Sequence, residues 1–495
     1  MAQATGAKAK AGTDSRSNRP RHSIIFNSRP NAAPRGTVVL HAVLLLLLFS
    51  ILTGLSIYIL CPFSLPSRVR GSCHLLDLSQ RLLFLIRFLH KSLFLIFNMV
   101  SSKFIGGLAA RASFLMSSAP VERASEATYT ANAVLAVEAL QTWYDAADGL
   151  WTTTGWWNGA NCLQVLADFA SLNADEANKL NIGGIISNTF TMAQQSVQIA
   201  SKTMMAGLGL VLMESSYTKT PVSDLEARGF GGFINNFYDD EGWWALALIR
   251  SYDVTGVPGY LDMAQHIFED MKAGVDSVCG GGIWWSKDKK YKNAIANELY
   301  LAVAASLANR PGNKQYYLDA AIAEWNWFKH SGMINSQNLI NDGLTINSDG
   351  SCTNNGANTW TYNQGVILGG LVELSKANSD KDLLTVASNI AGAAISSLSK
   401  NGILYEGCEP NCGADGAQFK GIFMRNLRYL HQAAPQDAFK NFLLANADSI
   451  WASDRTNDNK LGITWTGPAS AGGGPNAGTH SSAMDALVGA VAVAS

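Results

Sequence analysis

Two aspartates follow each other directly in the stretch NNFYDDEGWW, residues 235–244, and a glutamate comes next. The types and spacing of Asp239 and Asp240 indicate acid–base chemistry. One ionised carboxylate raises the pKa of its neighbour, so two adjacent acids can share a single proton. The ionised acid can then attack while the protonated one donates, as cleavage of a glycosidic bond requires. The alternative interpretation is a solvated helix start, where acids cap free backbone N–H groups.

The expected separation of the two carboxyl groups indicates which mechanism they suit. Retaining glycosidases hold the two groups ~5–5.5 Å apart, and inverting ones ~6.5–9.5 Å apart. Neighbouring Cα atoms are ~3.8 Å apart, so side chains that diverge from them reach the shorter separation more easily. A tandem pair therefore favours retention.

Tryptophans and amides gather beside loops rich in glycine and asparagine. Core packing explains part of the tryptophans, because indole buries well once its N–H has a partner, and the remainder resembles platforms for sugar rings. The amides offer paired donors and acceptors suited to hydroxyl groups. Trp156, Tyr238 and Asn297 are accordingly candidate substrate-binding residues. No Arg/Lys cluster or Gly-rich phosphate loop accompanies them, so the composition favours a neutral carbohydrate.

From about Ser125 the chain has the periodicity of amphipathic helices. Residues 241–271 place a Thr-Gly-Val-Pro-Gly turn between two such runs, which predicts a helical hairpin with a short loop. The other ranges with this design are 297–328, 363–398 and 421–452. Single helices are expected over 129–145, 159–172, 185–197 and 481–494.

Small residues dominate the first helix of each hairpin, such as Gly365, Gly369 and Gly370. Small faces let helices approach closely, as an inner layer wrapped by an outer one requires. Repeated two-helix units form either an open solenoid or a closed ring, and long loops collected at one end of a ring can build a binding cleft. We therefore expect an all-α fold, a closed ring of helical hairpins with a cleft at one rim.

Charge divides the chain at about residue 125. Residues 1–125 carry 15 Lys/Arg against 3 Asp/Glu, and the remaining residues carry 22 against 35. An acidic body is a poor partner for nucleic acid, because affinity for phosphate backbones comes largely from cations. No nucleic-acid partner is therefore expected.

The first quarter of the chain does not have the pattern of a globular domain. We expect a basic disordered tail over 1–36, a transmembrane or signal-anchor segment over 37–61, and a leader or linker over 62–125. Alternatively, translation begins at Met99 and a weak secretory signal follows, which would make the preceding residues an artefact of the gene model. Either way the acidic body is expected in the secretory pathway, membrane-anchored or secreted, and facing the lumen or exterior.

Cysteine and histidine spacing adds two expectations. Cys408 and Cys412 lie in a turn-rich loop, where they could close a small disulfide. The pairing among the five body cysteines stays open, and these are Cys162, Cys279, Cys352, Cys408 and Cys412. There is no C-x-x-C pair, and no H-x-x-x-H spacing occurs in the body, so no metal site is expected.

Several segments resemble the signature blocks of glycoside hydrolase family 76, the α-1,6-mannanases. They are NNFYDDEGWWALALIRSYDVTG, GWWNGANCLQVLADF, NELYLAVAASLA, NTWTYNQGVILGGL, DGAQFKGIFMRNL and GITWTGP. The resemblance covers roughly residues 126–495 in order, and it is to the fungal branch. It implies that this range is a catalytic domain with an (α/α)6 barrel and a cleft at one end, preceded by a non-globular N-terminal leader.

The resemblance also implies roles for individual residues. Asp239 would be the nucleophile and Asp240 the acid/base. Asn363 and Asp415 would lie in or near the cleft. The supporting or stacking groups would be Trp244, Tyr362, Gln364 and Phe419. No metal and no organic cofactor is implied.

The expected function is retaining endo-hydrolysis of α-1,6-mannosidic bonds in unbranched mannan. The expected substrate is α-1,6-mannan or a mannosylated cell-wall glycan. The membrane would be a further partner through the N-terminal segment, if that segment is retained. The protein is expected to be a monomer. One alternative is a cell-wall transglycosidase that passes mannan or a GPI glycan to another sugar. The second is a non-catalytic, membrane-tethered glycan-binding protein whose acids only cap a helix.

Overall fold

The computed structural model describes residues 123–196, 198–207, 210–219 and 231–494 of the 495-residue chain. These residues belong to one compact unit, Ser118–Ser495. The segments expected over 1–36 and 37–61, nearly all of the 62–125 leader, and Met99 lie outside the described residues. Among the helices that are described, none is long and apolar enough to cross a bilayer.

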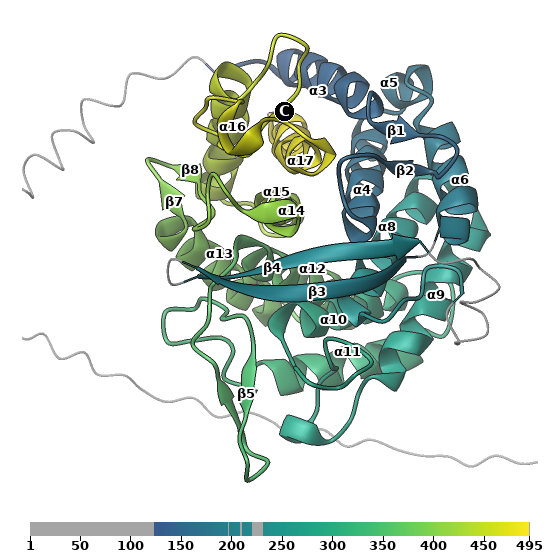
Figure 1. The fold of residues 1–495 in the computed structure, drawn as a ribbon, viewed down its shortest axis with the longest axis vertical. Coiled ribbons are helices and arrows are strands. Elements are labelled where there is room, and N and C mark those ends of the chain that lie inside the picture. Colours follow the sequence, from purple (N-terminus) through teal and green to yellow (C-terminus); the bar gives the residue numbers. More distant parts are fainter. Residues whose placement is uncertain (1–122, 197, 208–209, 220–230, 495) are drawn as a thin grey trace, which may run out of the picture. The chain divides into compact units, whose positions relative to one another are not determined.

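Six helices form a closed inner ring, which Figure 1 shows in a view along the ring axis. Each of the six packs against the next in chain order, and the last packs against the first, so the ring closes. They are α4 Trp156–Leu172, α8 Tyr238–Thr255, α10 Ala294–Ala308, α12 Thr361–Asn378, α15 Phe419–Ala433 and α17 Ala477–Val493. Helix α10 is buried along its whole length, as expected of an inner layer.

An outer layer of helices, each buried along one face, wraps the ring. Each outer helix packs against an inner one: α3 on α17, α6 on α4, α9 on α8, α11 on α10, α13 on α12, and α16 on both α15 and α17. Their bounds are α3 Glu126–Gln141, α6 Ile182–Ala193, α9 Pro258–Ala273, α11 Lys314–Phe328, α13 Asp382–Ser397 and α16 Asp437–Ser453. Two short helices, α5 Ala174–Lys179 and α14 Gly413–Gly416, lie in the connections. The architecture is an (α/α)6 barrel, and the predicted fold class is confirmed.

Close approach of the inner helices explains their small residues. A Cβ atom at Gly365 of α12 would lie 2.6 Å from the Cα atom of Phe423 on α15, and one at Gly421 of α15 would lie 2.5 Å from the Cα atom of Ser482 on α17. Because real Cβ contacts are longer than this, only glycine lets these backbones meet. The small residues therefore set the spacing of the ring.

The turn predicted within 241–271 is also present. Helix α8 ends at Gly256, whose φ of 69° is in the left-handed region that favours glycine. Helix α9 begins at Pro258, whose missing N–H costs nothing at a first helical position. The up-and-down alternation that follows makes all six inner helices run in the same direction, so their N-terminal ends meet at one end of the barrel.

The described strands form four two-stranded antiparallel sheets. Three are short: β1 Tyr144–Asp145 with β2 Leu150–Trp151, β5 Leu344–Ile346 with β6 Cys352–Asn354, and β7 Ser399–Lys400 with β8 Ile403–Leu404. The fourth is a long hairpin that the sequence did not predict, β3 Gln198–Gly207 with β4 Leu210–Lys219. In Figure 1 it lies across the middle of the ring.

Two disulfides tie loops together. The predicted Cys408–Cys412 bond is confirmed and lies directly before α14. The second joins Cys279 to Cys352 across 73 residues. Cys162 is free and buried in α4.

Candidate active site

A cleft at the N-terminal ends of the inner helices contains the first aspartate of the pair. Its lining comes from the first turns of α4, α8, α12 and α15, from α14 and from the β3–β4 hairpin. The lining residues are Trp157, Lys202, Asp239, Trp243, Trp360, Tyr362, Cys412, Asp415, Gly416 and Phe419. The space between them is about 20 Å³.

The two aspartates begin α8 and share one cation. Both lie in the first helical turn, where the helix dipole favours negative charge. Lys202 Nζ donates to Oδ2 of Asp239 at 2.7 Å and to Oδ1 of Asp240 at 2.6 Å. The Lys202 side chain is only 3% exposed, and its burial is offset by the two carboxylates, which raise its pKa.

The two acids differ in their surroundings. Asp240 is fully buried, and its Oδ2 accepts from Asn235 Nδ2 at 2.8 Å and from the Tyr217 hydroxyl at 3.3 Å. Burial raises the pKa of Asp240 to about 6, with a further increase from the charge of Asp239 and an opposing effect of Lys202. Asp239 lines the cleft, and its Oδ1 has no hydrogen-bond partner among the described residues. The arrangement suits Asp240 to hold a proton and Asp239 to attack.

The shared lysine also limits the separation of the acids. The two oxygens that contact Nζ can be no further apart than the sum of their distances to it, 5.3 Å. Retaining enzymes hold their carboxyl groups at ~5–5.5 Å and inverting enzymes need ~6.5–9.5 Å. The bound on these two oxygens is compatible with the separation in a retaining pair.

The third acid of the motif serves the fold. Glu241 is fully buried, pairs with Lys287 at 2.9 Å and accepts from the backbone N–H of Asn235 at 3.1 Å. Burial raises its pKa well above the ordinary value. Its side chain fixes the segment that enters α8, and it is not part of the cleft lining.

A further acid faces the pair from α14. Asp415 accepts from Trp157 Nε1 at 2.8 Å and from the Ser215 hydroxyl at 2.7 Å. Burial raises its pKa, and Lys202 opposes this. The Cys408–Cys412 disulfide precedes α14 and constrains the loop that positions this carboxyl group.

Aromatic rings form one wall of the cleft. Trp157 stacks on Trp243 with ring centroids 5.4 Å apart, and Trp243 is nearly parallel to Tyr362 at 6.5 Å. Tyr362 stacks in turn on Phe419 at 3.9 Å. Such a row presents π faces of the kind on which sugar rings can lie.

Of the residues predicted to bind substrate, Tyr362, Asp415 and Phe419 lie in the cleft lining. Trp156 and Trp244 do not lie in the lining. In each tandem tryptophan pair the neighbouring residue, Trp157 or Trp243, lines the cleft instead. Trp156 and Trp244 pack against each other in the core at 5.5 Å, while Trp157 and Trp243 face the cleft. Consecutive helical residues point about 100° apart, so only one of each pair can face the axis.

The other predicted residues lie in the supporting structure. The Tyr238 ring packs directly against Gly274. A Cβ atom at that position would lie 2.7 Å from the ring. The Asn297 side chain bonds both backbone groups of Ile283, and Gln364 does the same for Ile340. Both amides thus hold loops onto inner helices.

Asn363 is fully buried on α12, next to Tyr362 in sequence. Neither polar atom of its side chain has a partner among the described residues. Asn363 is not among the residues that line the cleft. A role for it near the cleft stays a prediction.

The structure adds residues that sequence reasoning missed. Trp157 and Trp243 carried a signal, since both belong to tryptophan pairs beside the acid motif and the first helix. Lys202, Ser215 and Tyr217 carried none, because their contacts with the acids depend on the register of a hairpin distant in sequence. Among the described residues, no three His, Cys, Asp or Glu side chains gather into a possible metal site.

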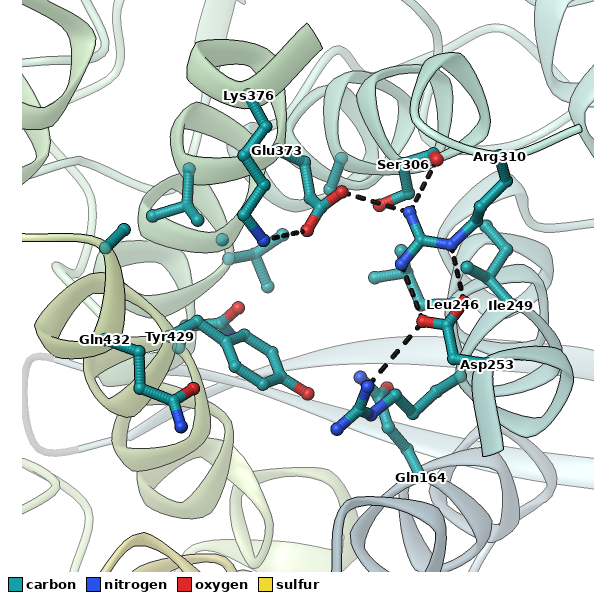
Figure 2. Close-up of a pocket in the computed structure, with 17 residues that line it drawn as sticks. Gln164, Leu246, Ile249, Asp253, Ser306, Arg310, Glu373, Lys376, Tyr429 and Gln432 are labelled. Carbon is teal, nitrogen blue, oxygen red and sulfur yellow. Dashed lines mark hydrogen bonds and ion pairs between the residues drawn. The ribbon is translucent and has the colours of Figure 1, made fainter. Parts of the chain in front are cut away.

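A second cavity, of about 390 Å³, opens at the other end of the barrel. Figure 2 shows its charged side chains joined in pairs. Arg310 donates to Asp253 at 2.9 and 2.7 Å and to Glu373 at 3.0 Å, and Lys376 donates to Glu373 at 2.8 Å. These pairs connect α8 and α12 with Arg310, just after the end of α10. We interpret the network as structural and call these four residues the clasp.

Comparison with known proteins agrees with this geometry. The model of Glycosyl hydrolase family 76 matches residues 125–494, and the chain therefore belongs to that family. The mannan endo-1,6-alpha-mannosidase DFG5 of Saccharomyces cerevisiae is 29% identical over 57% of this chain and 63% of its own. The protein of the same name from Candida albicans is 31% identical over 42% of this chain and 50% of its own. The chain thus spans about half to two thirds of these curated relatives.

A solved structure shares the fold. It is an inactive variant of the alpha-1,6-mannanase GH76A of Salegentibacter sp. HEL1_6, in complex with alpha-1,6-mannotriose. Two consecutive aspartates are replaced by asparagine in that variant. The TM-score is 0.59 at 21% identity, over 73% of this chain and 99% of that one.

Proposed function

We propose that this chain is a retaining endo-α-1,6-mannosidase. The observation that carries the proposal is the buried acid pair, with two oxygens no more than 5.3 Å apart at the base of an aromatic cleft. The family, the names of the curated relatives and the inactivating double substitution in the Salegentibacter enzyme support it.

The proposed mechanism is a double displacement. Asp239 attacks the anomeric carbon of the mannose while Asp240 protonates the leaving glycosidic oxygen. Asp240, now ionised, takes a proton from water, which attacks the glycosyl-enzyme and releases Asp239. The raised pKa of Asp240 suits it to both proton transfers.

Linkage specificity is the first test. Purified protein incubated with linear α-1,6-mannan should release reducing ends, and α-1,2- and α-1,3-linked mannans should stay intact. Equal release from all three would contradict the assigned substrate. Tight binding of α-1,6-mannan with no release by wild-type protein would instead support the glycan-binding alternative.

The acceptor of the second step is tested separately. With water as the proposed acceptor, products shorten continuously even when α-1,6-mannotriose is in excess. Oligosaccharides longer than the donor, formed in preference to hydrolysis products, would assign the chain to the transglycosidases.

We propose further that the barrel acts as a monomer outside the cytosol, in the secretory pathway or beyond it. Two disulfides support an oxidising compartment, since such bonds are rare where thiols are kept reduced. The N-terminal segment over 37–61 would supply a membrane anchor if it is retained. Fractionation of cells expressing the tagged full chain, with and without carbonate extraction, tests the compartment and the anchor.

A further inference from the structure

The β3–β4 hairpin covers the acid pair with one face. Side chains alternate along a strand, and the register pairs Lys202 with Ser215 and Ala200 with Tyr217. Lys202, Ser215 and Tyr217 contact Asp239, Asp240 and Asp415. The alternate residues Ser201 and Ser216 are exposed. The hairpin therefore has an inner polar face matched to the acids.

The side chains of this inner face form hydrogen bonds with the proposed catalytic acids, Asp239 and Asp240. Both oxygens of Asp240 already have partners, Oδ1 with Lys202 and Oδ2 with Asn235 and Tyr217. An acid catalyst must place its proton on the leaving oxygen at hydrogen-bond distance. Asp240 is also fully buried in this arrangement, so neither oxygen is accessible to a substrate.

The lysine nitrogen also lies where substrate would react. Lys202 Nζ is within 2.7 Å of both acids, and the scissile bond must lie between the same two groups. With the lysine in place, the enclosed volume at the base of the cleft is about 20 Å³, which is close to the size of one ordered water. The ammonium and a bound sugar therefore exclude each other.

Polar contacts hold the inner face of the hairpin down, in addition to the packing of Ala200, Ile199 and Tyr217 against the apolar core. Besides the contacts with the acids, Ala200 exchanges two backbone hydrogen bonds with the Asn236 side chain, and the Lys202 ammonium lies 4.6 Å from the Phe237 ring centroid. Sugar hydroxyls can replace hydrogen bonds of this kind with the acids, because they both donate and accept.

We propose that the β3–β4 hairpin is an autoinhibitory cover, and that Lys202 occupies the place of the scissile bond until a glycan chain displaces it. The inference rests on the proposed function for the identity of that glycan. A protein whose binding-competent form is a minor fraction has its apparent affinity reduced by that fraction. Lys202 thus raises KM while leaving kcat unchanged, because the lysine has already left in the substrate complex.

The kinetic test compares Lys202→Met with Ser201→Ala, a matched change on the outer face of the same strand. With α-1,6-mannotetraose as substrate, K202M should lower KM about tenfold at unchanged kcat, and S201A should match wild type. A fall in kcat of about 100-fold or more, or an unchanged KM, would overturn the proposal.

A second variant guards against misfolding of K202M. The double change Ser215→Ala and Tyr217→Phe keeps the lysine and removes two hydroxyl contacts with Asp415 and Asp240. It should lower KM by about threefold at unchanged kcat, since fewer contacts favour the covered form. A KM equal to that of wild type would contradict the cover.

Hydrogen exchange tests the cover without any glycan. Amides of 199–202 and 215–218 should exchange about tenfold or more faster than those of α10, through local opening. K202M should accelerate them further, and S201A should not. Exchange that K202M leaves unchanged would overturn the cover. If wild type releases nothing from mannan, the proposed function fails, while this exchange experiment still decides the role of the hairpin.

Discussion

The two ends of the barrel differ in how their charged side chains are paired. At the C-terminal ends of the inner helices, Arg310 is balanced by Asp253 and Glu373, and Lys376 by Glu373, at distances of 2.7–3.0 Å. At the N-terminal ends, Asp239, Asp240 and Asp415 face a single lysine supplied by the hairpin. The same ring thus has a network of ion pairs at one end and, in the cleft at the other end, three acids that face one lysine among the described residues.

The difference supports the proposal that the acidic end is the active end. Paired charges stabilise the ring, whereas crowded carboxyl groups raise one another's pKa and cost stability that only a function explains. The larger cavity lies at the clasped end and the smaller one at the acidic end. The proposed active site is therefore assigned from the acids and not from cavity size.

The largest expected effect comes from the acid pair itself. Asp239→Asn and Asp240→Asn should each reduce kcat on α-1,6-mannan by at least about 10³-fold, because each removes a group that acts in the reaction. Tm should stay the same or rise, since a buried like-charge contact is relieved. Glu373→Gln at the clasped end is the control and should keep wild-type kcat. Near-normal kcat in either aspartate variant would refute the assignment.

The dependence of kcat/KM on pH should follow the ionisation of Asp240 and not that of the clasp residues. Asp240 must be protonated in the first step and its pKa is raised to about 6, so kcat/KM should fall tenfold per pH unit above about pH 6. Lys202 favours the ionised form, so K202M should move this fall to higher pH. Arg310→Met should leave it in place. A profile that K202M does not move would contradict the contact between lysine and acid.

The tryptophan pairs offer a comparison within one helix. Trp243→Phe should raise KM about tenfold, because this ring belongs to the cleft wall. Trp244→Phe should leave kinetics unchanged and lower stability by about 1–3 kcal/mol, since it opens a cavity against Trp156. Steady-state kinetics and thermal unfolding on both variants check the assignment, and reversed results would exchange the two roles.

The clasp should affect stability and leave catalysis alone. Arg310→Met removes one of the two cations that pair with each of the partly exposed acids Asp253 and Glu373, which costs about 2 kcal/mol. A fall in Tm of about 3 °C with unchanged kcat/KM at 25 °C is expected. A loss of activity without a loss of stability would place function at this end as well.

Local patterns made the fold predictable. Apolar periodicity, the Gly256 and Pro258 turn and the small residues of the inner helices define hairpins that can pack closely, and their repetition favours a ring. The acid pair was equally visible, because charge crowding is a local feature. Residues with these signals need no knowledge of distant contacts.

What escaped prediction depends on distant contacts. Lys202 meets Asp239 across 37 residues through a hairpin whose register the sequence does not mark. The Cys279–Cys352 bond spans 73 residues. Which tryptophan of a pair faces the cleft follows from helix rotation, and packing of the whole ring sets that rotation.

Retention requires two carboxyl groups that act from one short separation. The direct measurement follows the anomeric proton signals of the first product by NMR while the protein cleaves linear α-1,6-mannan. A double displacement by Asp239 and Asp240 predicts that the new reducing end first appears as the α anomer and then mutarotates. First appearance of the β anomer would contradict the retaining pair.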